Sequence, residues 1–152
     1  MKRNQIVLSL LLCVGSLTPA LADSSLIARS ELEQEVRTFQ EAGDCDAAKG
    51  LFYTHGMDKV RKRAFAKTLE DDFCLIFGRK IASIAFQSVD PNKQEQPADF
   101  NGKRSAYTLD PRGVIVIDFG EGKPGEAKSM SLLYGMYDGK AYLIATKNAE
   151  AK

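Results

Sequence analysis

The hydrophobic pattern of this chain changes its period at Gly78, and that change limits the folds it can adopt more than any other feature. Before Gly78, apolar residues recur every three to four positions, which is typical of one face of an α-helix. After Gly78, apolar and polar residues alternate, which is typical of a half-buried β-strand. The pattern therefore predicts an α+β domain, with three N-terminal helices packed on a curved antiparallel sheet of four to five strands.

The helical part divides into three predicted helices. The first covers residues 24–42 and ends before Gly43, because glycine is favoured just after a helix C-terminus. Asp44 can cap a short second helix over residues 45–52, and Asp58 a third one that runs to about Phe77. The expected apolar stripe of the third helix is Val60, Ala64, Phe65, Leu69 and Phe73. Its basic residues would then form a solvated face, made of Lys59, Arg61, Lys62, Arg63 and Lys67.

The second part contains five predicted strands, over residues 80–89, 105–109, 114–119, 129–137 and 140–147. Asp110 to Gly113 has the composition of a type I turn, with proline in second place and glycine in fourth. Asp138-Gly139 lies between the last two strands and strongly favours a two-residue hairpin.

The first 22 residues have the layout of a secretory signal peptide. Lys2 and Arg3 precede an apolar run of about 12 residues, and Ala20-Leu21-Ala22 forms a small-x-small cleavage site. The run is shorter than the roughly 20 residues that span a bilayer, so no membrane span is expected in the mature chain. We expect cleavage near Ala22, a periplasmic or secreted location, a single domain over residues 23–148 and a frayed tail over 149–152.

Cys45 and Cys74 are the cysteines that remain after cleavage of this leader. An even pair in an exported chain predicts a disulfide, and two buried free thiols are the alternative. The leader carries two of the chain's 21 Lys and Arg residues and none of its 20 Asp and Glu residues, so the mature net charge is −1. This balance does not favour nucleic acid as a partner.

The chain has one histidine and no clustered metal ligands, so neither a metal nor another cofactor is expected. It also contains no nucleophile elbow and no phosphate-binding loop. The composition and motifs therefore favour a non-enzymatic binding protein, with an envelope protein or a small molecule as its partner.

Three stretches carry a family resemblance, at residues 47–52 (AAKGLF), 77–80 (FGRK) and 134–144 (YGMYDGKAYLI). With the order of the elements, they make the chain similar to the cystatin-like, or nuclear-transport-factor-two-like, α+β superfamily, and to its small exported bacterial members of unknown function. The resemblance implies a cone-like sheet with a pocket at its open end. It also implies either a binding protein or a pocket enzyme of the isomerase or dehydratase type.

The candidate site residues follow from the residue pattern and from the family resemblance together. Enzymes of this superfamily often pair a histidine or a tyrosine with an aspartate, so His55 and Asp118 are the candidate catalytic pair. The candidate binding residues, on predicted strands, are Tyr107, Tyr134, Met136 and Tyr142. Because the strand over 129–137 has large apolar residues on both faces, a homodimer through the sheet is a further prediction.

Overall fold

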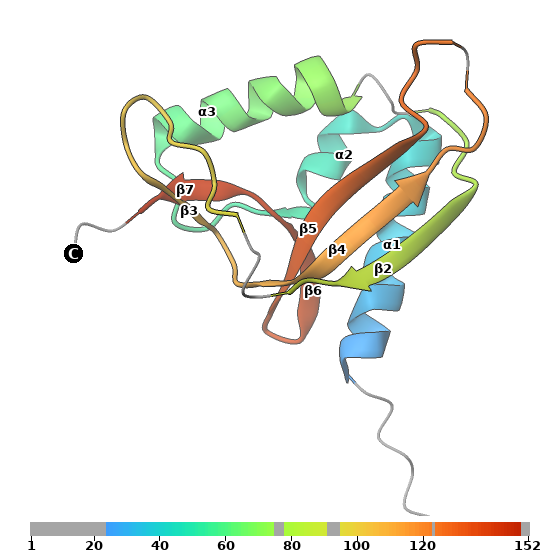
Figure 1. Cartoon of the computed structure of the whole chain (residues 1–152), viewed down its shortest axis with the longest axis horizontal. Coiled ribbons are helices and arrows are strands. Elements are labelled where there is room, and N and C mark those ends of the chain that lie inside the picture. Colours follow the sequence, from blue (N-terminus) through green and yellow to red (C-terminus); the bar gives the residue numbers. More distant parts are fainter. Residues whose placement is uncertain (1–23, 75–77, 91–94, 123, 150–152) are drawn as a thin grey trace, which may run out of the picture.

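The computed structural model describes residues 24–74, 78–90, 95–122 and 124–149. The predicted leader, residues 1–22, lies outside the described residues, as do residues 150–152 of the predicted tail. The described chain forms an α+β fold with a five-stranded sheet, as expected, and its α-helices precede the first long strand (Figure 1).

The first two helices form where local signals predict them. Helix α1 covers Ser24–Ala42 and buries a stripe at helical spacing, made of Ala28, Leu32, Val36 and Gln40. Gly43 follows it with a φ of 70°, the left-handed conformation that glycine adopts without strain. The carboxylate of Asp44 accepts a hydrogen bond from the backbone N–H of Ala47 at 2.9 Å and so caps α2, Cys45–Lys49.

The third helix starts at its predicted cap but buries a different face. Asp58 accepts a hydrogen bond from the backbone N–H of Arg61, and α3 covers Lys59–Thr68 before it continues as a π-helical turn, η1, Leu69–Phe73. Val60 is 62% exposed, whereas Arg61 is only 3% exposed, so the first turn of the predicted stripe is wrong. Arg61 lies four residues before Phe65 and eight before Leu69, so it continues their face of the helix, and Val60 lies about 100° away from it.

The main sheet has the strand order β1-β6-β5-β4-β2. These strands are Phe52–Tyr53 (β1), Lys140–Ile144 (β6), Ser129–Tyr137 (β5), Pro111–Asp118 (β4) and Ser83–Ser88 (β2). Neighbours are antiparallel except β1, which pairs in parallel with β6, so the prediction of a purely antiparallel sheet is wrong. Strand β1 takes the place of the end of the predicted second helix. This short strand is stabilised by its pairing with β6, some 90 residues away in the chain, so the local sequence does not predict it.

The chain leaves the main sheet at Ala145 instead of continuing in one long strand. Strand β7, Thr146–Asn148, pairs with β3, Ser105–Tyr107, in a separate two-stranded sheet. Thr108 holds the chain at this break: its backbone N–H and its hydroxyl donate to the carbonyl of Ala145, and its hydroxyl also accepts the N–H of Ala145. The chain bends here, and the predicted turn at Asp110–Gly113 is instead the start of β4, with a β-bulge between Pro111 and Gly113.

The helices cover one face of the main sheet. Ile115 and Ile117 of β4 and Leu143 of β6 have no exposed surface and belong to one apolar core with the buried stripe of α1. Helix α1 packs against β6, and α3 lies on the side of the β3–β7 pair (Figure 1). Residues that alternate with Ile115 and Ile117 therefore point away from the helices, and these include Asp118.

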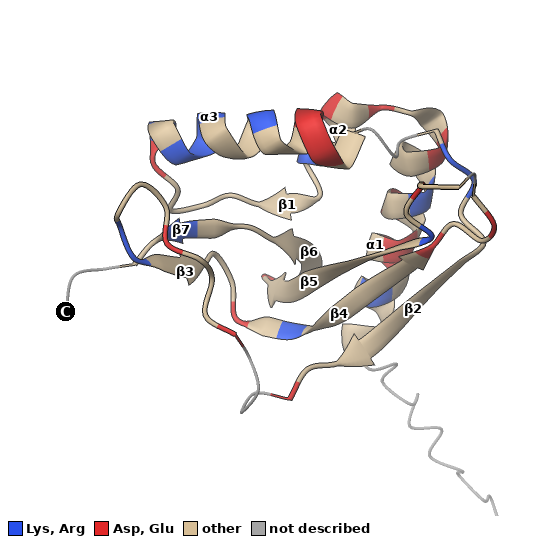
Figure 2. Ribbon diagram, turned by 45° about the horizontal axis from the view of Figure 1, so that its top comes forward, with Lys and Arg blue, Asp and Glu red and all other residues tan. Residues whose placement is uncertain are grey.

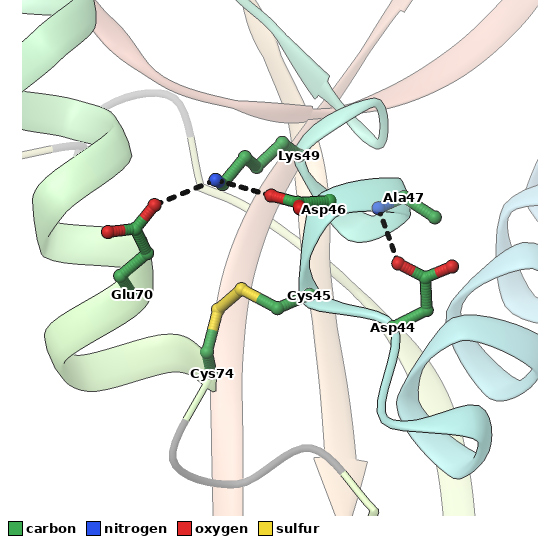
Figure 3. A network of polar contacts seen from close by, with 7 residues as sticks. All are labelled: Asp44, Cys45, Asp46, Ala47, Lys49, Glu70 and Cys74. Carbon is green, nitrogen blue, oxygen red and sulfur yellow. Dashed lines mark hydrogen bonds and ion pairs between the residues drawn. A yellow bond between two sulfur atoms is a disulfide. The ribbon is translucent and has the colours of Figure 1, made fainter.

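The predicted disulfide and hairpin are both confirmed. Cys45 at the start of α2 is bonded to Cys74, the residue after η1 (Figure 3). Lys49 bridges Asp46 and Glu70 at 2.7 and 2.9 Å beside the disulfide, and hydrogen bonds to these carboxylates raise the pKa of Lys49 to about 12. Asp138 and Gly139 have φ angles of 49° and 75° and connect β5 to β6 in the two-residue turn that their sequence favours.

Candidate functional site

The structure does not bring His55 and Asp118 together. His55 is exposed in the loop after β1, and Asp118 ends β4, three strand spacings or about 14 Å across the sheet. Asp118 pairs with Ser129 of β5. Tyr134, five residues further along β5, pairs with Leu143 of β6, which pairs in turn with β1. Asp118 and β1 are therefore also displaced from each other along the strand direction. These separations are far beyond the reach of a hydrogen bond, even through one water molecule.

Each member of the predicted catalytic pair has a local environment of its own. Asp118 is half-buried on the face away from the helices, and its carboxylate accepts the backbone N–H of Gly120 at 2.7 Å. This contact shapes the turn after β4 and places the carboxylate outside the layer between helices and sheet. The ring of His55 lies 6.0 Å from the ring of Tyr53.

His55 instead borders a group of three tyrosines on the outer face of the sheet, which we call the tyrosine cluster: Tyr53, Tyr137 and Tyr142. The ring centroid of Tyr53 lies 4.8 Å from that of Tyr137 and 5.5 Å from that of Tyr142. Loss of water contact around the ring raises the pKa of Tyr53. Tyr142, a predicted binding residue, therefore packs mainly against other protein rings.

Tyr107 is also occupied by a protein contact. It lies on β3 in the small sheet, and its hydroxyl donates a hydrogen bond to the backbone carbonyl of Glu95 at 2.9 Å. Burial of the hydroxyl raises the pKa of Tyr107. This arrangement connects the loop before β3 to the small sheet, and Tyr107 is remote from the other predicted binding residues, which lie on the main sheet.

Tyr134 and Met136 come together in a hollow between the N-terminal turn of α1 and the end of the main sheet. The hollow has a volume of about 430 Å³, within the roughly 300–1,000 Å³ of small-molecule sites. We call it the basic hollow, and the described residues that line it are Ser24, Ser25, Arg29, Arg112, Tyr134 and Met136. The register places Tyr134 and Met136 on the helix-facing side of β5, opposite Leu143 and Ala141 of the core.

Tyr134 is the most constrained side chain of the basic hollow. It is 5% exposed, and its ring lies edge-on to Phe86 with the centroids 5.3 Å apart. The ring passes directly over Gly113, where a Cβ atom would lie 2.6 Å from the ring and 2.9 Å from the hydroxyl. No described residue hydrogen bonds to this hydroxyl, so it retains one donor and its acceptor capacity for a ligand.

Two arginines contribute the charge of the basic hollow. Arg29 donates through Nε to the carbonyl of Ser25 at 3.2 Å, and its guanidinium carbon lies 6.0 Å from the ring of Phe86. Arg112 is exposed at the β-bulge of β4, and within the described chain no carboxylate forms an ion pair with it. Both guanidinium groups present hydrogen-bond donors only, so the site fits a ligand with acceptor oxygens and negative charge.

The described lining of the basic hollow lacks the side chains that most often transfer protons near neutral pH. Among the described residues that line it there is no carboxylate, histidine or cysteine. Met136 adds an apolar wall beside the charged groups. Sequence reasoning missed Arg29 and Arg112, because they lie on distant elements and Arg112 is part of a segment with the signature of a turn.

A second polar arrangement, around Arg61, was also missed. The buried guanidinium donates to Ser105 Oγ from both terminal nitrogens, to Thr146 Oγ1 and to Asn148 Oδ1, over distances of 3.0–3.1 Å. It also lies 4.7 Å from the centroid of the Phe100 ring. All these hydrogen-bond partners are neutral, and they join α3 to the β3–β7 pair.

Among the described residues, no group of three or more His, Cys, Asp or Glu side chains could hold a metal ion, and no helix has the length and apolarity to cross a membrane. No protein-family model, curated protein or solved structure matches this chain significantly. The resemblance to the cystatin-like and nuclear-transport-factor-two-like superfamily therefore stays a prediction.

Proposed function

We propose that this protein is an exported binding domain of the bacterial envelope that takes a small anionic ligand in the basic hollow. The observation that carries this proposal is that the buried Tyr134 lines a hollow of about 430 Å³ together with Arg29 and Arg112. The disulfide between Cys45 and Cys74 supports export, because such bonds persist in oxidising compartments.

The ligand class follows from the lining. Two guanidinium groups and one hydroxyl recognise a carboxylate or phosphate, and charge-assisted hydrogen bonds of this kind are about twice as strong as neutral ones. Met136 and the ring of Tyr134, which packs edge-on against Phe86, supply apolar contact surface. An amphipathic anion, with a charged head and a short apolar tail, satisfies both parts of the site. A cone-like sheet that opens at this end would agree with the superfamily resemblance.

The experiment is a titration of the protein with octanoate, followed by two-dimensional amide NMR. Octan-1-ol is the matched neutral probe, since it has the same chain length but no charge. We expect octanoate to shift the amide signals around Arg112 and Tyr134, and octanol to bind at least tenfold more weakly. Equal affinity for the two probes, or octanoate shifts confined to other regions, would refute the proposal.

Two variants test which groups recognise the anion. Arg112→Gln removes a charge-assisted hydrogen bond worth about 1.5–3 kcal/mol, so octanoate should bind roughly 10- to 100-fold more weakly. Tyr134→Phe keeps the ring and should weaken binding several-fold. Arg63→Gln is the control, because Arg63 is an exposed arginine on α3 that does not line the hollow. If all three variants bind alike, the hollow is not the binding site.

Export has its own readout, independent of the ligand. The chain is expressed with its leader, and the mass of the accumulated protein is measured before and after reduction. A mass that starts at Asp23 and rises by two hydrogens on reduction supports cleavage near Ala22 and the oxidised Cys45–Cys74 pair. An intact leader refutes the export part of the proposal and leaves the ligand experiment unaffected.

A further inference from the structure

Strand β2 forms one edge of the main sheet, and among the described residues nothing pairs with its outer side. It pairs with β4 along six residues and lies at the end of the strand order (Figures 1 and 2). The opposite edge is β1, which has only two residues. One edge of the sheet is therefore short, and the other presents a full-length strand with unpaired backbone groups.

This edge lacks the devices that usually prevent pairing between molecules. Edge strands are commonly protected by charged residues, proline, a β-bulge or a covering element. Strand β2 reads SIAFQS, with neither charge nor proline, its pairing with β4 is regular over all six residues, and Figure 2 shows it without coloured segments. Four of its six residues are exposed, and Ile84 and Phe86 are only partly buried.

We propose that β2 pairs antiparallel with β2 of a second copy of this chain, across a two-fold axis at Ala85. Residues directly opposite each other in an antiparallel pair share a face of the sheet. With the axis at Ala85, Ile84 faces the partner subunit's Phe86, and both lie on the helix-facing side. This pairing joins an aliphatic and an aromatic side chain twice and extends the two five-stranded sheets into one.

The order of side chains in β2 selects this register and this occupant. With the axis at Ala85, the partly buried Ile84 and Phe86 meet on one face, and the exposed Ser83 lies opposite the partner subunit's Gln87 on the other. A shift of the axis to Phe86 would place Ile84 opposite the partner subunit's Ser88 and lose both aliphatic–aromatic pairs. The strand is therefore complementary to itself, which is the requirement for a two-fold interface.

The first test is the oligomeric state of the full chain without ligand, by sedimentation velocity from about 1 µM to about 1 mM, where weak interfaces form. We expect a concentration-dependent dimer. Ala85→Lys and Ala85→Glu each place like charges opposite each other at the axis and should give monomers, whereas their mixture should restore the dimer. Ser131→Lys is the control, because Ser131 is exposed on β5, away from the edge, and this variant should dimerise like the wild type.

The second test reads the register by cross-linking in a Cys13→Ser background that keeps the disulfide. Ala85→Cys should cross-link to itself under mild oxidation. Ser83→Cys and Gln87→Cys should cross-link only when the two variants are mixed, because these positions face each other across the axis. A wild type that is monomeric at every concentration, or a dimer that persists in Ala85→Lys, would overturn the proposal. Because no ligand is present, these outcomes are independent of binding in the basic hollow.

Discussion

Replacing the buried Arg61 by methionine should destabilise the protein strongly, and the size of the effect can be worked from its contacts. The guanidinium makes four hydrogen bonds to three neutral acceptors and packs over the ring of Phe100. Methionine keeps much of the aliphatic volume, so the substitution isolates the charged group.

The hydroxyls of Ser105 and Thr146 can rotate to other partners, but the amide oxygen of Asn148 loses its donor. The loss of a hydrogen bond from a charged donor such as the guanidinium costs about 1.5–3 kcal/mol. Loss of the cation–π contact with Phe100 adds about 0.5–2 kcal/mol. Relief of the cost of burying a charge offsets part of this. We expect a net loss of about 2–4 kcal/mol, a large share of the about 5–15 kcal/mol that is typical of a folded domain.

The measurement is equilibrium unfolding in urea, followed by circular dichroism. With a slope of about 1.5 kcal/mol per molar urea, the midpoint of Arg61→Met should fall by roughly 1.3–2.7 M. Arg63→Met is the control, because Arg63 lies two residues further along α3 and is exposed, so its midpoint should barely change. Equal midpoints for the two variants would show that the Arg61 contacts do not stabilise the fold.

Three further changes test other parts of the fold. The pair of substitutions Cys45→Ser and Cys74→Ser opens a loop with a sequence separation of 29 and should cost about 3–4 kcal/mol in urea unfolding; an unchanged midpoint would contradict this. Gly113→Ala brings a Cβ atom to 2.5 Å from the Gln87 carbonyl and should cost about 1–3 kcal/mol, measured in the same way; wild-type stability would contradict the close approach. The hydrogen bond from the backbone N–H of Arg61 lowers the pKa of Asp58. The stability that the charged carboxylate contributes is therefore fully present above the pKa of the unfolded chain, about 3.9, and is lost as the pH falls through the lower pKa of the folded protein. Asp58→Asn keeps the helix cap but not the charge, so between pH 7 and about pH 3 its melting temperature should fall less than that of the wild type; equal falls would contradict this.

The predictions that succeeded depend on residues close together in the chain. Asp44 and Asp58 cap the helices that follow them, because a carboxylate reaches the backbone N–H three residues on. Asp138 and Gly139 form the hairpin turn because they tolerate positive φ angles. The change of period at Gly78 predicted the α+β fold class for the same reason, since periodicity is a property of neighbouring residues.

The candidate site was predicted only in part. Tyr134 and Met136 alternate along one strand, so the sequence could place them on the same face. Arg29 comes from α1 and Arg112 from β4, and no local pattern connects them to that face. His55 and Asp118 were paired by analogy, and the strand order places them on distant strands.

The sequence by itself determined the elements that local backbone chemistry decides, including the extent of α1, the helix caps, the closing hairpin and the even pair of cysteines. Only the tertiary structure decided the short strand β1, the break at Ala145 and the burial of Arg61. In each of these the stabilising partner lies far away in the chain: Leu143 for Phe52, Thr108 for Ala145, and Ser105 and Asn148 for Arg61. A buried arginine looks like a surface residue in sequence, because the hydrogen bonds that offset its desolvation come together only in the folded chain.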